Sequence, residues 1–262
     1  MAIIKLKILN QAGQTLAASP AGENVCLVYT GSYQAGDWVA LESDNKNLFC
    51  SIQLEDTMPP AIVYLPEGSL QFRIPPADNR SNYSPKSFTG SVHLLQAEIK
   101  APSAVRRNLA FNPYDSHESK GFFPHAQANV ETRNEAVFAA RNAIDGVFVN
   151  FSHGEWPYQS WGINRDPNAE LRLDFGRTVA VDELRLTLRA DFPHDSWWEE
   201  AMVEFSDGSR EALHFEKVET PQSFPIEPHK IEWLVLKELK KAADSSPFPA
   251  LTQIEVFGTE II

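Results

Sequence analysis

The stretch AELRLDFGRTVAVDELRLTLR occupies residues 169–189, and apolar side chains recur at every second position in both of its halves. These positions are Leu171, Leu173 and Phe175 in the first half and Leu184, Leu186 and Leu188 in the second. A period of two sends successive side chains to opposite faces, so each half buries one face and exposes the other. The stretch therefore predicts two antiparallel strands, at 169–176 and 181–189.

The same alternation continues toward the C-terminus. A strand is predicted at 201–206, where Val203 and Phe205 bracket Glu204. Asp207-Gly208 follows it, and this pair is a strong signal for a two-residue hairpin turn in which both residues take positive φ. Further strands are expected at 212–217, 231–236 and 251–257.

Two segments depart from simple alternation. The strand at 231–236 reads IEWLVL and is apolar on both faces, which predicts a central strand covered on both sides, with Trp233 in the core. One helix is predicted over about 135–143, with Asn134 as its N-cap and Gly146 as the residue that stops it.

The first hundred residues read as short strands separated by turns and proline pairs. The expected strands are 3–9, 25–29, 38–42, 48–54, 61–65, 70–74 and 91–99. Several short strands at this spacing are typical of a β-sandwich or jelly roll. A short proline-containing link at 100–103 ends this region. We therefore predict an all-β protein with two β-sandwich or jelly-roll domains, at 1–100 and 101–262.

Composition limits the partners and the compartment. The net charge of −12 disfavours non-specific binding to nucleic acid or to anionic membranes, and no run of residues is long and apolar enough to span a bilayer. The start, MAIIKLKILNQ, lacks the long apolar core of a signal peptide, so a cytoplasmic location is expected. Cys26 and Cys50 lie in apolar runs and are expected to be packed, reduced thiols.

Six blocks in the second half stand in a recognisable order. They are NLA at 108–110, AARNAIDG at 139–146, WG at 161–162, LRLDFG at 171–176, VEFSDG at 203–208 and IEVFG at 254–258. Together, over about residues 105–262, they resemble the discoidin, or coagulation factor 5/8 type C, family. The resemblance implies a galactose-binding-domain-like β-sandwich, whose common role is carbohydrate binding. Some members of the family bind lipid head groups or proteins instead.

The resemblance also implies a structural Ca²⁺. In this family the ion often lies where the Ala-Ile-Asp-Gly loop meets the final strand. Asp145 and Glu255 would supply the carboxylates, and Asn150 or nearby carbonyls would complete the shell of oxygen ligands that Ca²⁺ requires. In the alternative interpretation, Asp145 caps its own turn by accepting hydrogen bonds from backbone N–H groups. The sequence leaves both interpretations open.

Aromatic side chains are concentrated in two loops between the predicted strands, GEWPYQSW at 154–161 and ADFPHDSWWEE at 190–200. Sugar rings stack on aromatic faces, and their hydroxyls pair with carboxylates, imidazoles and guanidiniums. The candidate ligand-binding residues are Trp156, Tyr158, Arg189, His194, Trp197, Trp198 and Glu199, with Glu155 and Asp195 as further polar partners. In the alternative, Trp161 and one of Trp197 and Trp198 fill the core.

The sequence therefore predicts a non-catalytic, lectin-like protein that binds a carbohydrate or glycan fragment. Two alternatives remain: a cytoplasmic carbohydrate-active enzyme with its site between the domains, or a protein interaction module whose partner could be a second copy of the chain. The acids beside the tryptophans could serve a glycosidase. The sequence contains no HExxH, GxSxG, P-loop or dinucleotide-binding motif that would indicate another enzyme class.

Overall fold

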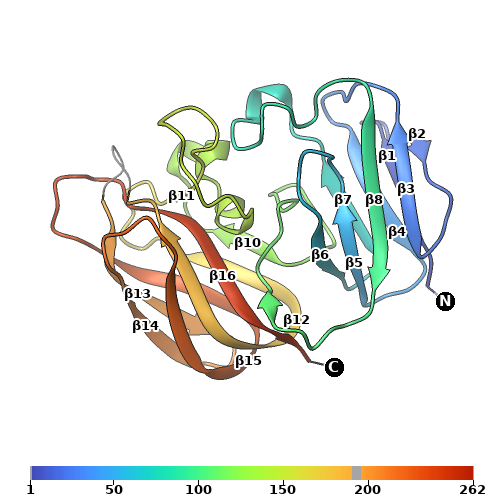
Figure 1. The fold of residues 1–262 in the computed structure, drawn as a ribbon. Coiled ribbons are helices and arrows are strands. Elements are labelled where there is room, and N and C mark those ends of the chain that lie inside the picture. Colours follow the sequence, from blue (N-terminus) through green and yellow to red (C-terminus); the bar gives the residue numbers. More distant parts are fainter. Residues whose placement is uncertain (1, 191–195, 262) are drawn as a thin grey trace. The chain divides into compact units, whose positions relative to one another are not determined.

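The structure is a computed structural model that describes residues 2–190 and 196–261, and the predicted all-β fold is confirmed (Figure 1). The chain forms two compact units. The first comprises Met1–Pro102 and Asn112–Phe123, and the second comprises Ser103–Phe111 and Pro124–Ile262. The chain therefore enters the second unit, returns to the first and enters the second again. Among the described residues, no helix has the length and apolar character needed to cross a membrane.

The first unit contains two four-stranded antiparallel sheets, with strand orders β2-β1-β4-β7 and β3-β8-β5-β6. The strands are β1 (Ile4–Leu9), β2 (Thr15–Ala18), β3 (Asn24–Tyr29), β4 (Trp38–Ser43), β5 (Leu48–Gln53), β6 (Ala61–Leu65), β7 (Ser69–Arg73) and β8 (His93–Lys100). A short 3₁₀ helix, η1, spans Ala77–Asn79. Alternate residues of β1 and β5 are buried, as the period of two requires. Sequence analysis did not predict β2. Cys50 is buried as expected, whereas Cys26 is exposed.

A carboxyl group is buried in the first unit. Glu55 is 1% exposed, and its Oε1 accepts a hydrogen bond from Thr57 Oγ1 at 3.1 Å. The pKa of Glu55 is raised to about 7, chiefly by burial and also by the adjacent Asp56, while hydrogen bonds from Thr57 and the Phe88 backbone oppose the rise. The neutral acid is therefore the form that this site stabilises.

The strands of the second unit run in the order β11-β16-β12-β15-β13-β14, with β10 paired to β12 and β9 paired to β16. They are β9 (Arg107–Asn108), β10 (His125–Ala128), β11 (Trp161–Gly162), β12 (Leu171–Leu188), β13 (Trp198–Phe205), β14 (Arg210–His214), β15 (Gln222–Lys241) and β16 (Ala250–Glu260). The strands predicted at 169–176 and 181–189 form one strand, β12, of 18 residues. Its pairing with β15 shifts register between Asp174 and Val179, where Gly176 has φ +66°. The irregularity bends the strand without ending it.

The prediction for Trp233 is wrong. β15 pairs with β12 on one side and β13 on the other, so it is central, but only one of its faces is buried in the core. Leu234 and Leu236 are fully buried, whereas Trp233 is half-buried. The Arg172 guanidinium lies over the Trp233 ring, 4.3 Å from its centroid. An arginine stem and head group therefore cover this tryptophan in place of a second layer of core.

The predicted helix at 135–143 is also wrong. The segment forms three short 3₁₀ helices, η2 (Thr132–Asn134), η3 (Ala136–Phe138) and η4 (Ala140–Ile144). Extended residues at Glu135 and Ala139 separate them, and Asn134 has φ +54° and caps none of them. The apolar spacing in this segment indicates only which side is buried. A series of 3₁₀ turns can bury that side as well as an α-helix can.

The turn at Asp207-Gly208 has a different form from the one predicted. Gly208 has φ +86°, and its N–H donates to the Phe205 carbonyl at 2.9 Å. Asp207 is not among the described residues with positive φ, and it accepts a hydrogen bond from the Ser209 N–H at 2.9 Å. This arrangement is a three-residue loop, in which a type I turn is followed by a left-handed glycine.

The buried Glu55 predicts a pH dependence of stability. Its folded-state pKa of about 7 exceeds the ordinary value of about 4.3, so the folded state binds the proton more tightly. The stabilisation is complete below about pH 4 and is lost as the pH rises through 7. In urea unfolding, Glu55→Gln should match the wild type at pH 4 and exceed its free energy of unfolding by on the order of 1–3 kcal/mol at pH 8. An equal difference at both pH values would contradict this assignment.

Candidate functional site

The second unit contains a cavity of about 160 Å³. Four stretches of chain contribute to its lining, at 132–138, 153, 160–165 and 248–250. The apolar lining residues include Phe138, Ile163, Phe248 and Ala250, and the polar ones are Thr132, Arg133, His153, Ser160, Asn164 and Arg165. No aspartate or glutamate is among the described residues that line it. We call this cavity the 132–165 pocket.

Two tight turns with left-handed backbone form one side of the 132–165 pocket. Arg133 and Asn134 both have φ +54°, and Asn164 and Arg165 have φ +49° and +61°. The Glu135 N–H donates to the Thr132 carbonyl at 3.2 Å, and the Asp166 N–H donates to the Ile163 carbonyl at 2.8 Å. Each turn therefore has two non-glycine residues with positive φ, as in a type I′ turn. The left-handed backbone costs Arg133 and Arg165 about 1–2 kcal/mol each, whereas asparagine tolerates it. Strained backbone of this kind clusters at functional sites.

The two turns are joined to one another. The Asn164 N–H donates to Thr132 Oγ1 at 2.9 Å, so one turn fixes the other. Gly162 allows this close approach, because a Cβ at that position would lie 2.7 Å from Thr132 Oγ1 and 3.1 Å from Phe138 Cδ1. Replacing this glycine would separate the two turns or displace Phe138.

Each turn carries an arginine that lies over a phenylalanine. The Arg133 guanidinium carbon is 5.6 Å from the Phe138 ring centroid, and that of Arg165 is 4.3 Å from the Phe248 centroid. Glu135 binds Arg133 through two hydrogen bonds of 2.6 and 2.8 Å. Arg165 forms no ion pair with the described residues. The pocket therefore presents one neutralised and one available cation beside two aromatic rings.

Ser160 adds a buried hydroxyl without a partner. Its side chain is fully buried, it lines the pocket, and its Oγ has no hydrogen-bond partner among the described residues. Buried polar atoms are nearly always hydrogen-bonded, and an exception calls for a ligand, a water molecule or a functional role. Because this hydroxyl has no exposed surface, it lies in the wall of the 132–165 pocket and not among the groups that a ligand can contact.

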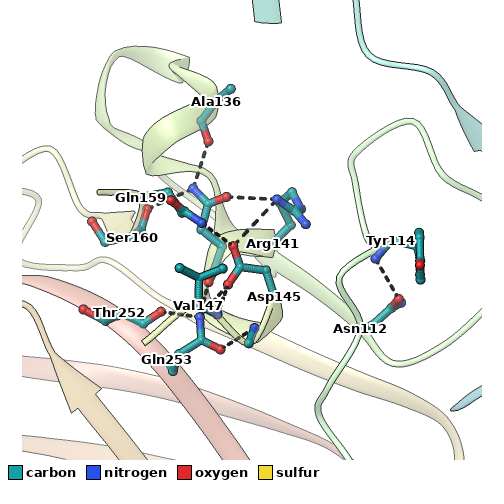
Figure 2. A network of polar contacts seen from close by, with 12 residues as sticks. Asn112, Tyr114, Ala136, Arg141, Asp145, Val147, Gln159, Ser160, Thr252 and Gln253 are labelled. Carbon is teal, nitrogen blue, oxygen red and sulfur yellow. Dashed lines mark hydrogen bonds and ion pairs between the residues drawn. The ribbon is translucent and has the colours of Figure 1, made fainter. Parts of the chain in front are cut away.

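A buried carboxylate lies beneath the segments that carry the pocket (Figure 2). Asp145 Oδ1 accepts hydrogen bonds from the Val147 N–H at 2.8 Å and from Gln253 Nε2 at 2.8 Å. Its Oδ2 accepts one from Gln159 Nε2 at 3.0 Å and lies 3.9 Å from Arg141 Nη1. Complete burial raises the pKa of Asp145, and Arg141 and the hydrogen-bond donors oppose the rise. Donors surround both oxygens, as an ionised carboxylate requires.

Amide side chains extend this network to the walls of the pocket. Asn142 Nδ2 donates to the carbonyls of Ala136 at 2.8 Å and Ser160 at 3.2 Å. The Ser160 N–H donates to the Val137 carbonyl at 2.9 Å. Gln253 accepts a hydrogen bond from the Gly146 N–H at 2.9 Å through its Oε1. These contacts tie η3, the 158–160 segment and β16 together, and thereby position Phe138 and Ser160.

The surroundings of Asp145 do not fit a Ca²⁺ ion. Gln253 Nε2 occupies the centre of a group of oxygens, 2.6 Å from Asn142 O, 2.7 Å from Thr252 O and 2.8 Å from Asp145 Oδ1. An amide N–H₂ group therefore takes the place where a cation would collect these oxygens. The hydrogen bond from Val147 matches the turn-capping alternative.

The other residues implied for the cation have different surroundings. Glu255 is half-buried and lies opposite Arg185 in the β12–β16 pairing. Burial raises the pKa of Glu255, Arg185 opposes the rise, and Glu183 adds to it. Asn150 is half-buried in the loop after Gly146. Among the described residues, no cluster of three or more histidine, cysteine, aspartate or glutamate side chains could hold a metal ion.

Three of the predicted ligand-binding residues lie next to one another on or beside β13. Trp198 is fully buried, 6.3 Å from Trp161 between ring centroids. Trp197 is half-buried and packs against the core, and Glu199 is exposed. Burial removes Trp198 from the side chains that a ligand can contact, so it fills the core as the alternative allowed. His194 and Asp195 lie outside the described residues.

The remaining predicted residues lie beside the pocket or support it. Arg189 is 1% exposed, and its Nη1 donates to the Tyr158 carbonyl, so it supports the backbone of this loop. Tyr158 is half-buried, and its ring meets that of His153 edge to face at 6.4 Å. Burial raises the pKa of Tyr158 and Glu135 adds to the rise, while Arg189 and Arg133 oppose it. Trp156 is half-buried in the same loop.

Most residues of the 132–165 pocket were not predicted from the sequence. Arg133, Phe138, Asn164, Arg165 and Phe248 were not among the predicted residues, because they come from separate segments without a shared motif. The run Asn164-Arg165-Asp166-Pro167 could have predicted the turn at Asn164 and Arg165. Asparagine tolerates the left-handed region, and proline often follows a turn. Asn134 gave a similar signal, which the apolar spacing after it led us to interpret as a helix N-cap.

Comparison with known proteins gives a partial structural likeness only. No family model matches the sequence, and no curated protein matches it. The structure of SpGH29 is 18% identical, with a TM-score of 0.41 over 59% of this chain and 28% of that one. The family 32 carbohydrate-binding module of C. perfringens NanJ in complex with galactose is 15% identical, with a TM-score of 0.39 over 50% of this chain and 91% of that one. The lectin domain of Lectinolysin complexed with Lewis B antigen is 16% identical, with a TM-score of 0.43 over 58% and 97%.

The burial of the tryptophans predicts a stability series. Trp198→Ala should lower the free energy of unfolding by about 3–5 kcal/mol, because it leaves a cavity in the core. Trp197→Ala and Trp233→Ala should each cost about 1–2 kcal/mol, because these side chains bury less area. Urea unfolding of the three variants measures the series. A Trp197 variant as unstable as the Trp198 variant would contradict the observed orientation of the strand.

The Gln253 amide predicts that the native protein is insensitive to calcium. Millimolar Ca²⁺ should leave the melting temperature of metal-stripped protein unchanged. Gln253→Glu places a second carboxylate against Asp145, which should cost about 2 kcal/mol or more, and added Ca²⁺ should restore part of the loss because it binds the native state. Gln253→Ala is the control, since it removes the amide without adding an oxygen ligand. Stabilisation of the wild type by Ca²⁺ would support the cation site instead.

Proposed function

We propose that this protein binds carbohydrate, without catalysis, through the 132–165 pocket. The proposal rests on one observation. Aromatic rings and polar side chains lie together at two strained turns, and a hydrogen bond joins these turns to each other. Phe248, which is 38% exposed, offers an aromatic ring of the kind on which the apolar C–H face of a sugar stacks. Asn164 and His153, which are exposed, offer the hydrogen-bonding groups that sugar hydroxyls require.

The chemistry of the lining favours binding over hydrolysis. A glycosidase flanks the scissile bond with two carboxyl groups, and the described residues that line the pocket include none. Glu135, on one of the two turns, is bound by Arg133 through both of its oxygens. The hydrogen bonds lower the pKa of Glu135 below its usual range, so it is a poor general acid. Recognition is the function that these groups support.

The size of the pocket favours a single sugar ring. Its volume of about 160 Å³ is smaller than the roughly 300–1,000 Å³ of pockets for drug-sized ligands. A terminal monosaccharide unit suits this volume better than an extended oligosaccharide does. The Arg133–Phe138 and Arg165–Phe248 pairs then provide the aromatic and charged groups that contact the ring.

Phe248→Ala tests the proposal with little risk to the fold, because Phe248 is 38% exposed. A glycan array should first identify the ligand, and calorimetry should then show that the variant binds it about 1–3 kcal/mol more weakly, by analogy with other stacking on aromatic side chains. Phe151→Ala is the matched control, since Phe151 is 71% exposed and does not line the pocket. Equal binding by the wild type and the Phe248 variant would exclude the 132–165 pocket as the sugar site.

A further inference from the structure

We propose that the sugar bound in the 132–165 pocket carries an anionic group and that Arg165 binds this group. The inference rests on the proposed function and adds the chemical class of the ligand. The shared chemistry is an anionic oxygen group on a sugar ring, which is either the carboxylate of a uronic acid or a sulfate ester.

The first support is the local charge. The protein has a net charge of −12, yet its pocket is lined by Arg133, Arg165 and His153 and by no described acidic residue. Because Glu135 neutralises Arg133, the charge that a ligand meets in this lining is that of Arg165, and a neutral sugar does not need it. A concave site lined by one sign of charge favours a ligand of the opposite sign.

The second support is the contrast between the two arginines of the pocket. Glu135 neutralises Arg133 with two hydrogen bonds, whereas Arg165 has no ion pair with the described residues. Every other arginine in the described part of the chain forms an ion pair with a carboxylate or donates a hydrogen bond to a carbonyl. These arginines are Arg73, Arg80, Arg106, Arg107, Arg141, Arg172, Arg177, Arg185, Arg189 and Arg210. Among the described arginines, only Arg165 therefore has no such partner, so its guanidinium N–H groups can donate to a ligand.

The third support is the way in which Arg165 is held. Its guanidinium lies 4.3 Å from the centroid of the Phe248 ring, and a guanidinium stacked on a ring keeps the N–H groups at its edge available. These parallel N–H groups match the two oxygens of a carboxylate or a sulfate. The turn at Asn164 and Arg165 is fixed by its bond to Thr132, so little freedom is lost on binding.

The test compares matched neutral and acidic sugars. Calorimetric titrations would use galactose with galacturonic acid, glucose with glucuronic acid, and galactose 6-sulfate, with inorganic sulfate as an anion that lacks a sugar ring. At least one acidic sugar should bind about tenfold more tightly than its neutral partner, as expected for added charge-assisted hydrogen bonds. The galacturonic acid and galactose 6-sulfate arms distinguish a carboxylate from a sulfate ester.

Arg165→Gln should remove this preference, so that the acidic sugar and its neutral partner bind the variant with affinities within about twofold of one another. Arg172→Gln is the matched control, because Arg172 lies over Trp233 at the same 4.3 Å but does not line the pocket. It removes the same charge from the protein and should leave the preference unchanged. Unchanged melting temperatures would show that both variants are folded.

The remaining outcomes separate the two proposals. Equal binding of neutral and acidic sugars, unaffected by Arg165→Gln, would overturn this inference while the proposed function stands. Inorganic sulfate that binds as tightly as the acidic sugars would also overturn it, because the ring would then contribute nothing. If neither the glycan array nor these titrations detect binding of any sugar, both proposals fail.

Discussion

The buried carboxylate of Asp145 is the constraint on which the irregular half of the second unit depends. The chain from Thr132 to Ile144 forms short 3₁₀ turns, so many of its backbone groups cannot pair in a ladder and need other partners. Asp145, Asn142 and Gln253 provide those partners or position them. A desolvated carboxylate is costly unless it is fully paired. Because Gln159, Gln253 and Arg141 come from three different segments, the requirement that they meet at Asp145 brings these segments together.

The pocket is a consequence of that arrangement. Each turn holds one arginine in the left-handed region at a cost of about 1–2 kcal/mol, and neither turn has a glycine at that position to relieve the cost. The bond between Asn164 and Thr132 holds the turns against each other, and the Asn142 amide fixes the carbonyls of Ala136 and Ser160 behind them. Burial of Trp161 and Trp198 in the core of the unit stabilises the sheet that carries these turns. Packing outside the pocket thus offsets the strain of the left-handed backbone. The two turns in turn hold an arginine over each of two aromatic rings.

The strands were predictable because a period of two is a local property of the sequence. Whether the two halves of β12 are one strand depends on pairing with β15 and β16, which is not local. Trp197 and Trp198 show the same limit: adjacent residues in a strand point to opposite faces, so the register decides which is buried. The helix predicted at 135–143 is wrong because the spacing of Val137, Ala140 and Ile144 indicates only that one side is buried. The 3₁₀ turns bury the same side. The residues of the 132–165 pocket could not be predicted, because they share no sequence motif and come close together only in the folded chain. The cytoplasmic location and self-association remain predictions.

The charge of the protein explains why recognition of an anion must be short-ranged here. A net charge of −12 repels anions at a distance, but at physiological ionic strength this repulsion is screened beyond about 8 Å. A single anionic group that reaches Arg165 therefore gains a direct, partly desolvated contact, whereas a polyanion would bring its other charges close to the acidic surface. In our proposal, the protein binds one charged group on a sugar although its own net charge is −12. Selectivity of this kind needs one unpaired arginine in an otherwise acidic protein, and an exposed cluster of basic residues would not provide it.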